Sequence, residues 1–133
     1  MSTTGSIPRK TTTPFFVATA VMEAAAGLGL LIGPALVIAL LLPGPVTNTH
    51  VALARLAGAA LLSLGAACWW ARADSGSAAS RALVVGMSVY NAAVIAIVLT
   101  GSFGSPSRPI LWAVTLLHGA MAAWGVSLLR SGR

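Results

Sequence analysis

Three polar residues in otherwise apolar stretches are the strongest chemical lead in this sequence. Glu23, Asn91 and His118 lie on three different hydrophobic segments of the 133-residue chain. A carboxyl group and an imidazole in a dry site can act as acid and base near neutral pH. Such a pair would suit protonation or isomerisation of a lipid-soluble substrate, binding of a quinone headgroup, or a proton relay. Glu23 and His118 are therefore the candidate catalytic residues.

Further polar side chains accompany these three along the chain. Tyr90 directly precedes Asn91, and hydroxyls of Ser88 and Thr115 lie nearby on the same segments. Arg55 lies about one turn into the second apolar segment, where it would attract an anionic headgroup. The candidate ligand-binding set is Glu23, Arg55, Tyr90, Asn91 and His118.

The sequence predicts no metal and no cofactor. His118 has no second histidine at helical spacing, and His50 would lie about 12 Å shallower, too far for two axial ligands of one haem. Cys68 is the single cysteine, which excludes an intrachain disulfide and a CxxC motif. Because apolar residues surround Cys68, we expect a thiol packed in the protein interior.

The composition identifies a membrane protein. Hydrophobic residues make up 57% of the chain and charged residues 8%, with a mean hydropathy of +0.91. A soluble domain carries about 25% charged residues. The net charge is +6, but the basic residues stand singly at the ends of apolar runs and form no patch. They are expected to contact membrane lipids, and nucleic acid is not an expected partner.

Four apolar segments are long enough to cross a bilayer, which takes about 20 residues per helix. Each must be a helix, because backbone groups in lipid have to bond within their own segment. Short links favour an all-α, up-down-up-down four-helix bundle as an integral membrane domain over residues 15–130, after a disordered cytoplasmic tail at residues 1–14. The expected helices cover residues 15–42, 51–71, 82–99 and 110–129.

Threading these helices through a bilayer brings the three polar residues to one depth. Glu23 lies about 12 Å from the inner end of its helix, Asn91 about 14 Å from the inner end, and His118 about 12 Å from the outer end. In a hydrocarbon core of about 30 Å all three lie near the midplane. A charge there is costly, so Glu23 should face the interior, be protonated, or pair with His118 or Arg55.

The basic residues predict the orientation. With the N-terminus inside, most of them fall on the cytoplasmic side, as the positive-inside rule requires. Trp69 and Trp70 would then lie in the inner aromatic belt with Phe15 and Phe16, and Trp112 near the outer belt. The inner set is Arg9, Lys10, Arg72, Arg81, Arg130 and Arg133, and the outer set is Arg55 and Arg108.

Glycine, proline and small residues predict how the helices bend and pack. Pro34 follows several glycines inside the long first helix, which predicts a kink around residues 29–34. Gly29 and Gly33 form a GxxxG motif, for which packing within the bundle is favoured over homodimerisation. Further small residues are expected at helix contacts: Ala59, Ser63, Ala92, Ala96, Gly119 and Ala123.

Short sequence patches resemble a known family. The first helix carries Gly27-Leu28-Gly29-Leu30-Leu31-Ile32-Gly33-Pro34, and the second carries Arg55 followed by small residues. Tyr90-Asn91 and Leu117-His118 mark the third and fourth helices. With the length and topology, these patches are similar to small bacterial four-helix membrane proteins of the DoxX-like type. The resemblance implies a four-helix bundle in a bacterial inner membrane and carries over no catalytic residue.

Three functions fit these observations. The first is a non-enzymatic membrane protein that binds a lipophilic ligand such as a quinone, or serves as a subunit of a homo-oligomer or larger membrane complex. In that case the buried polar residues cross-link helices. The second is an intramembrane enzyme that uses Glu23 and His118 as acid and base. A proton or small-solute carrier ranks last, because the inner half has few polar residues.

Overall fold

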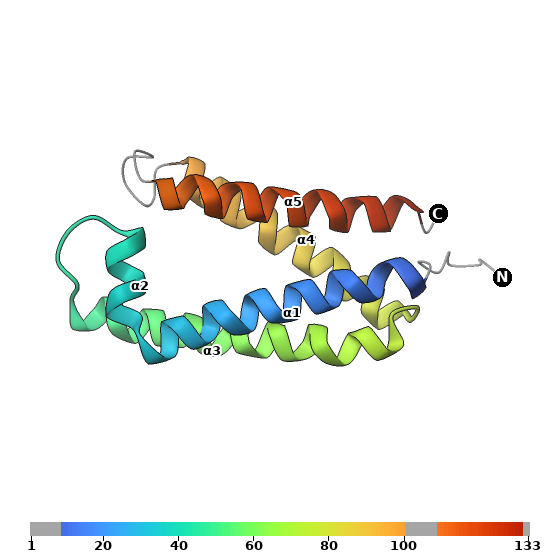
Figure 1. Ribbon diagram of the computed structural model, residues 1–133, viewed down its shortest axis with the longest axis horizontal. Helices are drawn as coiled ribbons and strands as arrows, with labels where there is room; N and C mark the ends of the chain where they lie inside the picture. Colours follow the sequence, from blue (N-terminus) through green and yellow to red (C-terminus); the bar gives the residue numbers. More distant parts are fainter. Residues whose placement is uncertain (1–8, 101–108, 132–133) are drawn as a thin grey trace.

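In the computed structural model the described part of the chain, residues 9–100 and 109–131 with side chains from residue 12, is all-helical. Four of its helices, α1, α3, α4 and α5, are long and apolar enough to span a membrane, which agrees with the composition (Figure 1). The elements are α1 (Arg9–Ile32), α2 (Pro34–Leu41), α3 (Asn48–Ala71), the 3₁₀ turn η1 (Arg72–Asp74), α4 (Ala78–Leu99) and α5 (Pro109–Ser131).

The first apolar segment is broken at Gly33. Proline has no N–H to continue a helix but fits the first helical position, and Pro34 accordingly begins α2. Gly33 leaves the helical region, with φ −124° and ψ 51°, while its N–H still donates to the Gly29 carbonyl at 2.9 Å. The kink predicted here is confirmed, but the helix expected over residues 15–42 is two helices, and α2 turns away from the α1 axis (Figure 1).

The beginning of the first helix also differs from the expectation. α1 starts at Arg9, so residues 9–14 of the expected tail are helical. Pro14 lies within the second turn of α1. The remainder of the expected tail, residues 1–8, lies outside the described residues.

Side-chain caps fix where α3 and α4 begin. Thr47 forms a reciprocal capping box with His50: the Thr47 hydroxyl accepts from the His50 N–H and the His50 Nδ1 accepts from the Thr47 N–H, each at 3.3 Å. Ser77 caps α4 by accepting from the Ser80 N–H at 3.1 Å. These caps satisfy helix-end donors where the chain turns, so the imidazole of His50 has a structural role.

α1 packs along α3, and α4 packs along α5 (Figure 1). Glycine residues allow the helices of both pairs to approach closely. A Cβ built at Gly58 would lie 2.8 Å from the Gly27 carbonyl oxygen, and one at Gly65 would lie 3.1 Å from the Ala20 carbonyl oxygen. Between α4 and α5, a Cβ at Gly125 would collide with the Ser88 hydroxyl. The backbones of α1 and α3 therefore meet at Gly58 and Gly65, whereas at Gly125 the backbone of α5 meets a side chain of α4.

The prediction that certain small residues lie at helix contacts is mostly wrong. Five of them are exposed, and the GxxxG pair also makes no close contact with a neighbouring long helix. The closest atom to a Cβ at Gly29 belongs to Val37 of α2, at 3.6 Å. A spacing of four residues does not reveal which face of an apolar helix is turned inward. The exposed five are Ala59, Ser63, Ala92, Ala96 and Ala123.

The hydrophobic core joins all four long helices near the start of α1. Phe15 and Phe16 are fully buried, so their predicted place in a lipid-facing aromatic belt is wrong. Phe15 instead packs edge to face on Trp124 of α5, with centroids 5.6 Å apart. Trp69, Trp70 and Trp112 are exposed. The core cluster contains Phe15, Phe16, Ala20, Cys68, Val84, Met87, Met121 and Leu128, and the free thiol of Cys68 is buried as predicted.

Candidate functional site

Glu23 lies on the buried face of α1 and is only 4% exposed. Its stem packs against α3, where a Cβ at Gly65 would lie 3.4 Å from the Glu23 Cβ. Its carboxyl group forms a side-chain hydrogen bond with Tyr90 of α4. Glu23 therefore faces the interior, as the cost of a charge in lipid requires, and its partner is a hydroxyl donor on another helix.

Asn91 and His118 join α4 to α5. The Asn91 amide is 2% exposed and donates from Nδ2 to the Met87 carbonyl at 2.6 Å. Its Oδ1 lies 2.7 Å from the His118 Nδ1. Because the amide nitrogen is engaged by a carbonyl, the amide oxygen faces the imidazole, and Nδ1 must be the donor. The Nε2 of a neutral His118 then carries the free lone pair.

Tyr90 connects these two hydrogen-bonded pairs. Its ring packs edge to face on the imidazole of His118, with centroids 5.7 Å apart and an interplanar angle of 76°. Since its hydroxyl also bonds Glu23, one side chain contacts both candidate catalytic residues. We call Glu23, Tyr90, Asn91 and His118 the polar cluster. It spans α1, α4 and α5. Asn91 and His118 contact each other directly, whereas Glu23 is joined to them only through Tyr90.

The geometry predicts one tautomer for His118. We expect the neutral imidazole to carry its proton on Nδ1, because that nitrogen faces the Asn91 oxygen. Nitrogen-15 chemical shifts of histidine-labelled protein in detergent or nanodiscs distinguish the two neutral tautomers. His50 provides an internal comparison, since its Nδ1 accepts the Thr47 N–H and therefore requires the opposite tautomer. Observation of the Nε2–H form at His118 would contradict the Asn91 contact.

Three of the nearby polar residues stand outside the polar cluster. Arg55 is exposed on α3, and no hydrogen bond or ion pair joins it to the described residues. Ser88 donates to the Val84 carbonyl and Thr115 to the Leu111 carbonyl, each at 2.8 Å within its own helix. The predicted contribution of Arg55 to a common site with Glu23 is therefore not seen in this arrangement.

Thr19 is a site residue that sequence reasoning missed. It lies one helical turn before Glu23, is 1% exposed, and its hydroxyl has no hydrogen-bond partner among the described residues. The signal was available in the spacing of four residues, which puts both side chains on one face of α1. Its burial extends the polar surroundings of Glu23 along α1.

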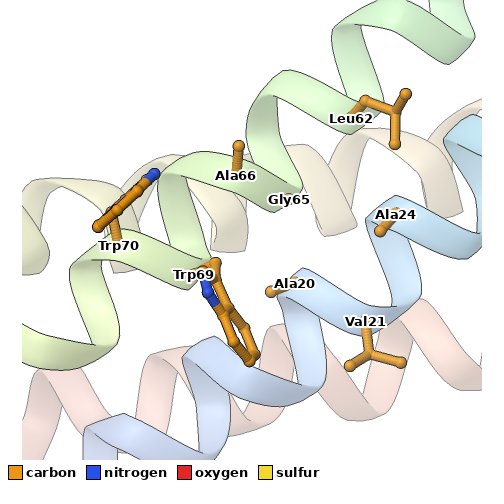
Figure 2. A pocket seen from close by; sticks show the side chains of 8 residues that line it. All are labelled: Ala20, Val21, Ala24, Leu62, Gly65, Ala66, Trp69 and Trp70. Carbon is orange, nitrogen blue, oxygen red and sulfur yellow. The ribbon is translucent and has the colours of Figure 1, made fainter.

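An open apolar groove runs between α1 and α3 on the outside of this helix pair (Figure 2). Its volume is about 410 Å³. Figure 2 shows the two indoles toward one end, Leu62 at the other, and the small residues between them. The lining residues are Ala20, Val21, Ala24, Leu62, Gly65, Ala66, Trp69 and Trp70.

Two smaller cavities lie elsewhere in the described part of the chain. One, of about 270 Å³, lies between α2 and α3 beside His50. The other, of about 230 Å³, lies between the end of α4 and the start of α5. The polar cluster lines neither of them, nor the larger groove. The cluster is thus a separate feature from these three spaces.

Comparison of the chain with models of protein families gave no match, and comparisons with curated proteins and with solved structures gave none either. The DoxX-like relationship therefore stays a prediction that rests on the sequence patches alone.

Proposed function

We propose that this protein is a small non-enzymatic membrane protein that binds a lipophilic ligand in the groove between α1 and α3. The observation that carries the proposal is the groove itself, whose volume of about 410 Å³ falls in the range of small-molecule sites, about 300–1,000 Å³. Its lining is apolar, so the recognised part of the ligand is hydrocarbon. In this proposal the polar cluster holds the helix pairs together.

The setting of the proposal is a bacterial inner membrane, crossed by α1, α3, α4 and α5 in up-down-up-down order. The start of α1 and the end of α5 lie at one end of the molecule (Figure 1). Basic residues concentrate toward the same end, which supports cytoplasmic termini. Assembly into a homo-oligomer or a larger membrane complex belongs to the same proposal.

Retention of lipid through purification tests the groove. Ala66 lines it and is exposed, so Ala66→Phe fills the groove from its edge without entering the core. We expect wild-type protein to keep bound lipid in mild detergent, and Ala66→Phe to lose most of it, as measured by mass spectrometry of extracts. Ala60→Phe is the matched control, since Ala60 is an exposed residue of α3 outside the groove. Equal retention by both variants would refute binding in the groove.

A second candidate function is acid–base chemistry on a lipid-soluble substrate. The observation that favours it is Tyr90, which contacts both Glu23 and His118. In this alternative the Nε2 lone pair of His118 would accept a proton from a substrate, and the carboxyl group of Glu23 would exchange a proton with the same substrate. Quinone headgroups are among the ligands that such a pair would suit.

Deuterium exchange distinguishes the two functions without a known substrate. Purified protein in nanodiscs made from a total bacterial lipid extract is incubated in D₂O, and the extracted lipids are weighed by mass spectrometry. The non-enzymatic proposal predicts no carbon-bound deuterium above a protein-free control. It also predicts that Glu23→Gln and His118→Gln change stability or assembly. Deuterium incorporation that both substitutions abolish at unchanged stability would instead establish the enzyme.

A further inference from the structure

The groove between α1 and α3 has a positive charge at one end. Arg72, which follows α3 directly, stacks its guanidinium group over the ring of Trp69, with the guanidinium carbon 3.6 Å from the ring centroid. Its Nη1 also donates to the Trp69 carbonyl at 2.5 Å. Trp69 in turn lines the groove. The cation is therefore held in a defined position beside the indole end of an apolar channel.

The charge of Arg72 is not neutralised by the described part of the chain. In the described residues its guanidinium group stacks on the Trp69 ring and donates to the Trp69 carbonyl, and its backbone carbonyl accepts a hydrogen bond from the Thr13 hydroxyl. None of these is an anion. A guanidinium group has five N–H donors in a planar fork that matches phosphate. Most of those donors are left to bind an anion from outside the chain.

The length and direction of the groove suit a lipid tail. Between Leu62 and Trp70 the floor extends about 12 Å along α3, at 1.5 Å per residue. Figure 2 shows small residues between Leu62 at one end and the two indoles toward the other. Tryptophan prefers the interface between hydrocarbon and headgroups, so that end corresponds to the headgroup level. The hydrocarbon lining then points toward the bilayer interior, as an acyl chain would.

We propose that the groove binds an anionic phospholipid, with one acyl chain along its small-residue floor and the phosphate on Arg72. This inference rests on the proposed function, since it names the ligand of the same groove. An anionic lipid is preferred over a zwitterionic one because the chain carries a net charge of +6 and Arg72 has no anionic partner in the described residues. A basic residue at a membrane surface favours anionic lipid by about fivefold in affinity.

Native mass spectrometry of the full chain tests the proposal. Delipidated protein in detergent is titrated with phosphatidylglycerol and with phosphatidylcholine of identical acyl chains. We expect phosphatidylglycerol to bind about fivefold tighter. Arg72→Gln should remove that preference by weakening phosphatidylglycerol binding more than phosphatidylcholine binding, since both lipids carry the phosphate but only phosphatidylglycerol is anionic. Arg130→Gln is the matched control, because Arg130 is an exposed arginine in the last turn of α5 and is not part of the groove.

The outcomes separate this inference from the proposed function. Equal binding of the two lipids by wild-type protein, or an equal loss of preference in both arginine variants, would overturn the phosphate site at Arg72. Lipid binding in the groove would still be supported if Ala66→Phe weakened the binding of both lipids at least tenfold and Ala60→Phe weakened the binding of neither. No effect of Ala66→Phe would overturn the proposed function as well. A lipid-free dimer that Ala66→Phe dissociates would identify a second copy as the occupant and refute the lipid.

Discussion

Gly58→Ala is expected to lower the free energy of unfolding in detergent by about 1–3 kcal/mol, the usual cost of overpacking a close contact. The added Cβ would lie 2.8 Å from the Gly27 carbonyl oxygen, where the backbones of α1 and α3 meet. A backbone oxygen cannot move aside as a flexible side chain can, so the two helices must separate. Equilibrium unfolding in mixed micelles, followed by circular dichroism, measures the loss.

Gly86→Ala is the control for that substitution. Gly86 is exposed on α4, and a Cβ there meets nothing within 4 Å. Alanine is the better helix former by about 0.8–1.0 kcal/mol, so this variant should be as stable as the wild type or more so. Equal stability of the Gly58 and Gly86 variants would show that α1 and α3 do not approach closely at Gly58.

Tyr90→Phe is expected to destabilise the protein by about 1–3 kcal/mol, because it leaves the buried carboxyl group of Glu23 without its hydrogen-bond donor. The phenyl ring keeps the edge-to-face contact with His118, so the loss reports the hydroxyl alone. Thermal and denaturant unfolding of the purified variant provide the measurement.

Thr19→Val is the matched control for Tyr90→Phe. It also removes one buried hydroxyl from the surroundings of Glu23, but in the part of the chain that the structure describes the Thr19 hydroxyl has no hydrogen-bond partner. Replacing an unpaired polar group by an apolar one of similar shape should be neutral or stabilising. If the Thr19 variant were destabilised as much as the Tyr90 variant, the loss of stability would come from packing. The hydrogen bond between Tyr90 and Glu23 would then make no separate contribution to stability.

The sequence predicted the helices and the depth of the polar residues, and both predictions rest on simple geometry. Apolar length requires membrane-spanning helices, and a fixed rise per residue puts Glu23, Asn91 and His118 at one level. Pro34 marked the break because its ring and missing N–H act locally. None of these predictions depends on how a helix is rotated about its own axis.

Predictions that depended on helix rotation were less successful. These helices are apolar all round, so no polar face indicates which side is turned inward. Arg55 was predicted to belong to the ligand-binding set and is exposed, whereas Thr19 was missed and is buried. Phe15 and Phe16 were assigned to lipid because aromatic rings favour the interface, but contact with Trp124 and the other core residues buries them.

The groove and its arginine could not be derived from the sequence for the same reason. Trp69 and Trp70 were predicted at a membrane interface, and both are exposed. What the sequence could not supply is that Ala20 and Ala24 of α1 lie opposite Gly65 and Ala66 of α3, which leaves a channel beside the indoles (Figure 2). That register is a long-range feature of packing, seen also in the close approach of α1 and α3 at Gly58.

The coupling free energy between Glu23 and Tyr90 tests most directly whether the polar cluster holds α1 against α4 and α5. It is obtained from a double-mutant cycle of wild type, Glu23→Leu, Tyr90→Phe and the double variant, each unfolded in the same mixed micelles. The hydrogen bond predicts a coupling of about 0.6 kcal/mol, the average for polar contacts between membrane helices, with about 1.7 kcal/mol as the upper limit. Additivity within about 0.3 kcal/mol would show that the two side chains do not interact. That result would contradict the proposed role of the polar cluster in holding the helix pairs together.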